Sequence, residues 1–150
     1  GDAKLGSIIG GTASRGKQSR DTFEKNVPAY GALVVKMKGA AKVGKVQSLV
    51  GGFIRIRHDH AALNTLLQGA GATVMKVALV IAYKSMKEAA IPFKIVANVH
   101  DEWQVETPAH FGKAVGMHLR QGIIQSGVDL NLRCPLDGEF KTGANWAETH

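Results

Sequence analysis

KIVANVHDEWQVET, residues 94–107, contains two short apolar runs on either side of a pair of acidic residues. The runs, Lys94–Val99 and Trp103–Thr107, are rich in β-branched and aromatic residues and are short enough to be strands. A tight turn between them would make an antiparallel hairpin with Asp101 and Glu102 at its tip. The stretch therefore predicts a β-hairpin that presents two adjacent carboxylates.

The two adjacent carboxylates, Asp101 and Glu102, repel each other and gain nothing from burial. A divalent cation would relieve that repulsion, because hard ions such as Mg²⁺ prefer carboxylate oxygen. A solvated acidic turn explains the same pair without a metal. The reason to favour a metal site comes from the rest of the chain.

The composition fits one folded domain with a polyanionic partner. The chain has 150 residues, is 45% hydrophobic and carries a formal net charge of +7. That length and hydrophobicity allow a real core, and the positive surplus is typical of proteins that bind nucleic acid. Cys134 is the single cysteine, so no internal disulfide forms and a reducing compartment fits. No uninterrupted apolar run reaches the roughly 18–20 residues that span a bilayer, so no membrane partner is expected.

The spacing of apolar residues predicts an α+β fold, with the hairpin and a terminal strand packed on long helices. Asp59 is the expected N-cap of the longest helix, and Gly127 is expected to end the last one. In a strand near residues 53–57, Ile54 and Ile56 would share one face. The helices are expected at residues 1–9, 12–26, 29–38, 59–89 and 107–126, and the terminal strand at 129–135.

Two further features suit a nucleic acid. His60, Asn64 and Gln68 recur every fourth residue and form an uncharged polar stripe on the longest helix. Ordinary surface polarity is the alternative, but a solvated face normally carries Lys and Glu. Amide groups both donate and accept hydrogen bonds, as base edges require. Residues 39–44 are mostly small and lie among lysines at positions 36, 38, 42 and 45. They are either a solvated loop or a phosphate-contacting loop.

Other chemistries find little support in the sequence. His58 and His60 are close, but no second pair of ligands has zinc-site spacing. No sequence pattern supports Cys134 as a catalytic nucleophile. Gly10-Gly11-Thr12 lacks the spacing of a phosphate-binding loop. What remains favours metal-dependent phosphoryl chemistry on a nucleic acid.

An ordered set of motifs resembles the C-terminal part of family A (Pol I-like) DNA polymerases, and in particular the replicative polymerases of short-tailed phages. The first motif runs from Arg57 through Gly69, and Val99–Glu102 follows some 30 residues later. Leu136–Glu139 and Asn145–His150 resemble the C-terminus of the same branch. The resemblance covers nearly the whole chain.

This resemblance implies roles for the residues of the hairpin. Val99–Glu102 matches the family's motif C on a palm hairpin. Asp101 matches the aspartate that binds both catalytic metal ions, and Glu102 matches the acidic neighbour that supports the site. His100 matches a residue near the primer terminus.

The resemblance also implies DNA contacts on the long helix. Asn64 and Gln68 match side chains that contact the minor groove of the primer–template, which presents acceptors at every base pair. His60 stands where many relatives have arginine. Arg57 begins the same motif and is grouped with these DNA-contacting residues.

Two parts of the family pattern are missing. Motif A, with the second metal-binding aspartate, and motif B, which grips the incoming nucleotide, precede this region in relatives. We therefore expect a C-terminal fragment of a split or truncated polymerase, with residues 1–50 from the fingers and 51–150 from the palm. It would need an N-terminal polymerase fragment, Mg²⁺, primer–template DNA and deoxynucleoside triphosphates, in the cytoplasm of a phage-infected bacterium. Unpaired sheet edges would favour homo-oligomers of the isolated fragment.

Two other functions remain open at this stage. One is a non-catalytic DNA-binding or assembly subunit. The other is a metal-dependent nuclease, for which Asp129, Asp137 and Glu139 are the additional acidic ligands available downstream of the hairpin.

Overall fold

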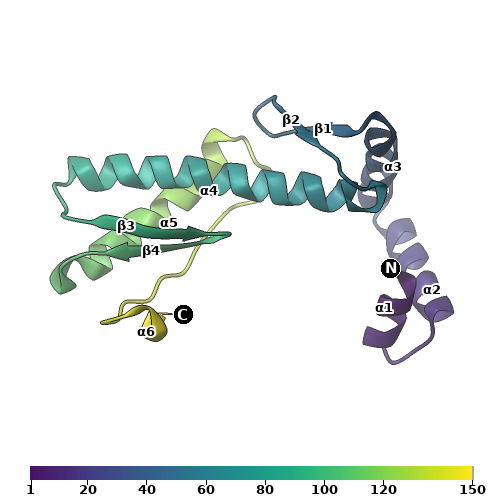
Figure 1. The fold of residues 1–150 in the computed structure, drawn as a ribbon, viewed down its shortest axis with the longest axis horizontal. Helices are drawn as coiled ribbons and strands as arrows, with labels where there is room; N and C mark the ends of the chain where they lie inside the picture. Colours follow the sequence, from purple (N-terminus) through teal and green to yellow (C-terminus); the bar gives the residue numbers. More distant parts are fainter. Residues whose placement is uncertain (150) are drawn as a thin grey trace. The chain divides into compact units, whose positions relative to one another are not determined.

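The computed structural model describes residues 1–149, without the side chain of Asp59, and divides them into two compact units. Unit 1 comprises residues 1–46 and 53–65, and unit 2 comprises residues 47–52 and the chain from Leu66 onward. Helices dominate, with two small two-stranded sheets (Figure 1). The expected α+β class is confirmed. The expected cap at Asp59 and the final residue of the closing motif, His150, lie outside the described part.

Unit 1 begins with two helices that approach each other closely. They are α1 (Asp2–Ile8) and α2 (Ala13–Asn26), and the backbone N–H of Arg15 donates to the Thr12 hydroxyl that caps α2. A Cβ atom added to the buried Gly16 would lie 2.1 Å from the carbonyl oxygen of Asp2. Only glycine allows the two backbones to come so near.

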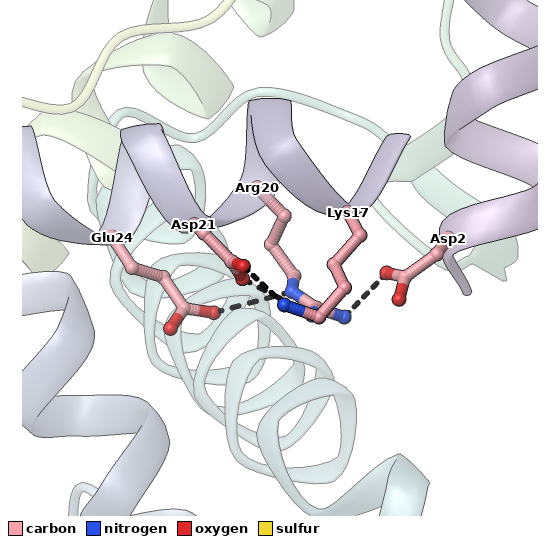
Figure 2. Close-up of polar contacts among 5 residues, drawn as sticks. All are labelled: Asp2, Lys17, Arg20, Asp21 and Glu24. Atoms are coloured by element: carbon pink, nitrogen blue, oxygen red, sulfur yellow. Dashed lines mark hydrogen bonds and ion pairs between the residues drawn. The ribbon is translucent and has the colours of Figure 1, made fainter. Parts of the chain in front are cut away.

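A partly exposed ion-pair network joins α1 to α2 (Figure 2). The guanidinium of Arg20 donates to Asp2 and Asp21 and lies 3.7 Å from a Glu24 oxygen, while Lys17 Nζ lies 2.6 Å from Asp21. Hydrogen bonding by Asp21 raises the pKa of Arg20, and hydrogen bonding by Lys17 lowers the pKa of Asp21. Both shifts favour the charged forms that hold the network together.

The third helix, α3 (Pro28–Val43), is longer than expected, and the interpretation of residues 39–44 as a loop is wrong. Ala40, Ala41 and Lys42 are good helix formers and continue the helix through that stretch. Gly44, at φ +78°, closes α3 in the left-handed conformation that suits glycine. The lysines at positions 36, 38 and 42 are therefore exposed on a helix.

A small hairpin follows, with strands β1 (Lys45–Gln47) and β2 (Phe53–Arg55). The backbone N–H of Ile56 donates to the carbonyl of Gly44 at 2.9 Å and extends the pairing beyond β2. Exposed and more buried residues alternate from 53 to 57, as the predicted strand requires.

A 3₁₀ turn, η1 (Asp59–Ala61), leads into the 27-residue helix α4 (Ala62–Glu88). An 18-residue window of α4 has a mean hydropathy of 1.6, so its length and composition would allow it to cross a bilayer. The sequence analysis found no uninterrupted apolar run of that length. The mean hydropathy of α4 is nevertheless high, because a few lysines and small polar residues hardly lower the average. A long apolar helix is also what the interior of a large protein requires.

Unit 2 has its core between α4, the hairpin of β3 (Lys94–Val99) and β4 (Glu102–Glu106), and α5 (Gly112–Asp129). The 3₁₀ turn η2 (Ala109–Phe111) precedes α5. A Cβ atom on Gly122 of α5 would lie 2.6 Å from the Ala78 carbonyl oxygen, so α4 and α5 touch backbone to backbone there. The buried residues of the core are Ala82, Met86, Ile91 and Val115, with Phe93, Val105, Phe111, Ala114 and Leu119 packed against them.

The predicted terminal strand at 129–135 is absent from the described chain, and Gly127 does not end α5. The helix continues to Asp129 and closes with Asn131 at φ +53°, where the Leu132 N–H donates to the Gly127 carbonyl at 2.9 Å. This is a Schellman-type end with asparagine in the left-handed position. Gly127 is instead buried against Leu136. The chain ends in the short helix α6 (Trp146–Thr149).

Candidate functional site

The hairpin of β3 and β4 forms as predicted, with a turn of two residues. Val99 pairs with Glu102, which leaves His100 and Asp101 between the strands. Glu102 therefore opens β4 instead of sharing the tip with Asp101. Asp101 is exposed, and Glu102 is half-buried.

His100 has a backbone conformation that is uncommon for residues other than glycine. Its φ is +53°. Two-residue hairpin turns require a positive φ at their first central position, which glycine or asparagine usually fills. Strained backbone of this kind concentrates at functional sites. The turn therefore places an exposed imidazole directly beside the Asp101 carboxylate in sequence.

A bulge in β3 decides which residues share a face of the hairpin. The register shifts between Ile95 and Ala97, so Ile95 pairs with Val105 whereas Ala97 pairs with Gln104. Val105 packs on the core of unit 2. Gln104 and Glu102, on the same strand two residues apart, lie on the opposite face.

A chain of hydrogen bonds anchors Glu102. The Gln104 side-chain amide donates to the Glu102 carboxylate, and the Thr149 hydroxyl of α6 donates to the Gln104 carbonyl oxygen at 3.3 Å. Glu102 is thus held in one orientation, whereas Asp101 is exposed in the turn. The two neighbouring carboxylates have different environments and can take different roles.

Sequence reasoning missed Gln104 and Thr149. The two-residue period of a strand would have placed Gln104 on the same face as Glu102. Nothing in the sequence connects Thr149 to Gln104, because 45 residues separate them.

The hairpin offers oxygen ligands of the kind that Mg²⁺ prefers, from Asp101 and Glu102. Among the side chains that the structure describes, no group of three or more His, Cys, Asp or Glu residues gathers around a common point. The donor chemistry fits a divalent cation, and the remaining ligands would have to come from water, substrate or another part of the protein.

Two of the three acidic residues considered for a nuclease, Asp129 and Asp137, are engaged in other contacts. Arg120 donates to both carboxylate oxygens of Asp137, at 2.6 and 2.8 Å, and Asp129 accepts a hydrogen bond from Gln125. The bonds from Arg120 and from the Gly138 backbone lower the pKa of Asp137 to about 2. Asp137 therefore ties the tail to α5.

We expect Asp137→Asn to remove a pH-dependent part of the stability. A carboxylate whose pKa falls from 3.8 to about 2 on folding stabilises the native state above pH 3.8, and this contribution disappears as the pH falls toward 2. The variant should unfold at a lower temperature than the parent near neutral pH. Thermal unfolding followed by circular dichroism at decreasing pH should show the two midpoints converging; a constant difference would contradict this assignment.

The polar stripe is exposed, as the sequence predicted. His60, Asn64 and Gln68 are all accessible, the latter two on α4. The His58 and His60 rings stack with centroids 5.7 Å apart. Arg57 is exposed as well. Arg57, His60 and Asn64 belong to unit 1, and the hairpin residues belong to unit 2.

Comparison with known proteins gives consistent matches. The profile of DNA polymerase family A matches residues 42–148. The chain is 36% identical over 157 residues to the DNA-directed DNA polymerase of Escherichia phage Phieco32, covering all of this chain and 26% of that protein. It is 33% identical over 172 residues to that of Enterobacteria phage T3, covering all of this chain and 24% of that protein. The chain thus spans about a quarter of the length of these curated relatives.

A solved structure has a similar fold. It is the POL domain of Pol1 from M. smegmatis in complex with DNA primer-template and dNTP, with a TM-score of 0.71 and 18% identity. The match covers 83% of this chain and 24% of that one.

Proposed function

Since the chain belongs to DNA polymerase family A, we propose that it supplies the C-terminal part of a polymerase domain. In this proposal residues 1–50 contribute to the fingers and residues 51–150 to the palm, and the β3–β4 hairpin is motif C. The assembled enzyme catalyses attack of a primer 3′-hydroxyl on a deoxynucleoside triphosphate, with release of pyrophosphate. The cytoplasm of a phage-infected bacterium is the compartment that the phage relatives suggest.

The observation that carries the proposal is the contrast between the two carboxylates of the hairpin. Asp101 is exposed in a strained turn, and Glu102 beside it is anchored through Gln104. An exposed, unburied carboxylate next to an oriented one is the arrangement expected of one corner of a metal-dependent site.

In the proposed site Asp101 is the ligand and Glu102 supports it. Bound Mg²⁺ would supply Lewis-acid chemistry there, namely activation of the attacking hydroxyl and neutralisation of the charge that develops on the phosphate. Asp101 supplies one carboxylate to that site, and a second aspartate, from the part of the polymerase domain that precedes this chain in its relatives, supplies the other. His100, beside Asp101 in the turn, contacts the primer terminus.

The exposed stripe of α4 suits the primer–template. Asn64 and Gln68 present amides to solvent, and amides can donate to the acceptors that the minor groove shows at every base pair. His60 and Arg57 extend this polar surface within unit 1. The solved polymerase domain with a similar fold holds DNA primer-template and dNTP, which supports these as the partners.

Exposed apolar side chains support the need for the N-terminal polymerase region. On the β3–β4 hairpin, Val96 is 59% and Val99 is 46% exposed, and large apolar residues are exposed on α4 and α5 too. Exposed apolar patches mark surfaces that another part of a protein covers. The chain spans about a quarter of the length of its relatives, and in this proposal the remaining part of such a polymerase covers these side chains. The large apolar residues that are exposed on α4 and α5 are Leu67, Val80, Tyr83, Met117 and Val128.

The test is a primer-extension assay on the 150-residue chain with and without the N-terminal polymerase region, supplied as a second polypeptide or fused ahead of Gly1. We expect extension with Mg²⁺ only when both parts are present. Extension by the chain alone, or a stable complex of both parts that does not extend a primer, would overturn the proposal.

A non-catalytic DNA-binding role is the second candidate, and the charge distribution favours it. From Lys25 to Lys87 the chain has ten Lys and Arg residues and one acidic residue, Asp59, for a formal charge of +9. Such a protein would bind duplex DNA with an affinity that falls with salt and does not depend on Mg²⁺ or on the identity of residue 101. The same primer-extension assay separates this role from catalysis.

A further inference from the structure

One face of β2 and its continuation displays an aromatic ring and two cations in a row. Phe53, Arg55 and Arg57 alternate with Ile54 and Ile56, and the first three are exposed while Ile56 is buried. Because alternate residues of a strand share a face, Phe53 and Arg55 lie on one side of β2, roughly 6.5–7 Å apart, and the exposed Arg57 follows two residues after β2 ends. We call these three residues, together with Lys45, the β2 face.

Phe53 is unusually accessible for its size. Its side chain is 67% exposed, and the ammonium of Lys45 on β1 lies 4.6 Å from the ring centroid. A cation over the ring is a favourable cation–π contact, and it keeps a positive charge beside the aromatic surface. An exposed phenylalanine contributes nothing to the core of unit 1, so its ring is available to a ligand.

The β2 face lies in the most basic part of the chain. Residues 25–58 contain seven Lys and Arg residues and no acidic residue. Within the described residues, the cations that form ion pairs are Lys17, Arg20 and Arg120, so Arg55 and Arg57 are not neutralised there. The face therefore matches a ligand that has both negative charges and flat apolar surfaces.

We propose that the β2 face binds a single-stranded nucleic acid, with an unpaired base stacked on Phe53 and phosphates on Lys45, Arg55 and Arg57. Exposed aromatic rings bordered by cations are the common device for single strands, because every base has a flat face. In a duplex the base faces are already stacked, so Phe53 discriminates for the unpaired strand. This inference rests on the proposed function. In the assembled polymerase the β2 face binds the part of the template strand that has not yet been copied.

The experiment measures fluorescence anisotropy of the 150-residue chain with three labelled probes of equal length: oligo-dT, an abasic strand with the same phosphates, and a blunt duplex. We expect the parent to prefer oligo-dT over the abasic strand. Phe53→Ala should weaken oligo-dT binding by about 5- to 150-fold, the effect of losing one stacked base, and should leave the abasic strand unaffected. Phe53→Trp should restore the preference.

Two controls separate stacking from charge and from folding. Phe23 is also exposed but lies near Asp21 and Glu24, so Phe23→Ala should bind like the parent. Arg55→Gln should lower the salt slope for single strands by about 0.7, whereas Phe53→Ala should not change it. Circular dichroism checks that each variant is folded.

The proposal fails if Phe53→Ala binds oligo-dT like the parent, or if the parent binds the abasic strand equally well. The second result would indicate a surface that recognises negative charge alone, as on an acidic protein partner. Neither result depends on catalysis. Failure of the primer-extension assay with normal Phe53-dependent binding would overturn the proposed function and leave the single-strand site intact.

Discussion

Replacing Asp101 with asparagine, in a complex with the N-terminal polymerase region, is expected to lower the primer-extension rate by a factor on the order of 10²–10³ or more. A metal-bound carboxylate contributes several kcal/mol of charge stabilisation in the transition state, and each 1.36 kcal/mol is a factor of ten in rate. The amide has nearly the same shape as the carboxylate but lacks its charge. Since Asp101 is exposed in the turn, the substitution should not disturb the core.

The matched controls for Asp101 are two other acidic residues of the same unit. Asp129→Asn, at a carboxylate bonded to Gln125 on α5, should leave the extension rate unchanged. Glu102→Gln should have a smaller effect than Asp101→Asn, because Glu102 is engaged with Gln104. Single-turnover extension measures the chemical step, and circular dichroism checks folding. A complex that extends primers at the parental rate with Asp101→Asn would remove the hairpin from the active site.

Local pattern was enough to predict the β3–β4 hairpin. The two apolar runs have few other ways to pair, and a two-residue turn fixes the register from Val99–Glu102 to Ala97–Gln104. Pattern also predicted that Ile54 and Ile56 share a face. It did not predict the bulge after Ile95, because nothing in the local composition marks an unpaired residue there.

The errors arose where a local signal had a tertiary cause. Gly127 looked like a helix end, but it is glycine because Leu136 packs against α5 at that point. Residues 129–135 were predicted to be a strand, yet Leu132 instead closes the helix by bonding back to Gly127. In the first case a contact with a residue elsewhere in the chain determines the structure, and in the second a backbone hydrogen bond does; neither can be read from the local pattern.

The site was predictable only in part for the same reason. The exposure of Asn64 and Gln68 and the position of Asp101 follow from period and turn length. The anchoring of Glu102 depends on Thr149, which reaches Gln104 across 45 residues. The assignment of residues 1–50 to the fingers and 51–150 to the palm rests on resemblance, because no local pattern defines those boundaries.

Truncating Met86 to alanine is expected to lower the free energy of unfolding by about 2–5 kcal/mol, the range measured when a large buried side chain is cut back to alanine. Met86 is fully buried and belongs to the same core cluster as Ile91 and Val115. That cluster joins α4 to α5 and to the loop that follows α4, so a cavity there has neighbours on several elements and collapses poorly. Denaturant unfolding gives the change from the midpoint and slope.

Met117→Ala is the matched control for Met86→Ala, because it removes the same atoms from a methionine of α5 that is 57% exposed. Surface substitutions of this kind usually change stability by no more than about 0.5 kcal/mol. If the two variants were equally stable, the core of unit 2 would not lie where Met86 places it. The hairpin rests on that core through Val105, so loosening it should also lower the primer-extension rate of the assembled polymerase while Asp101 stays intact, and the Met117 variant should not show this loss.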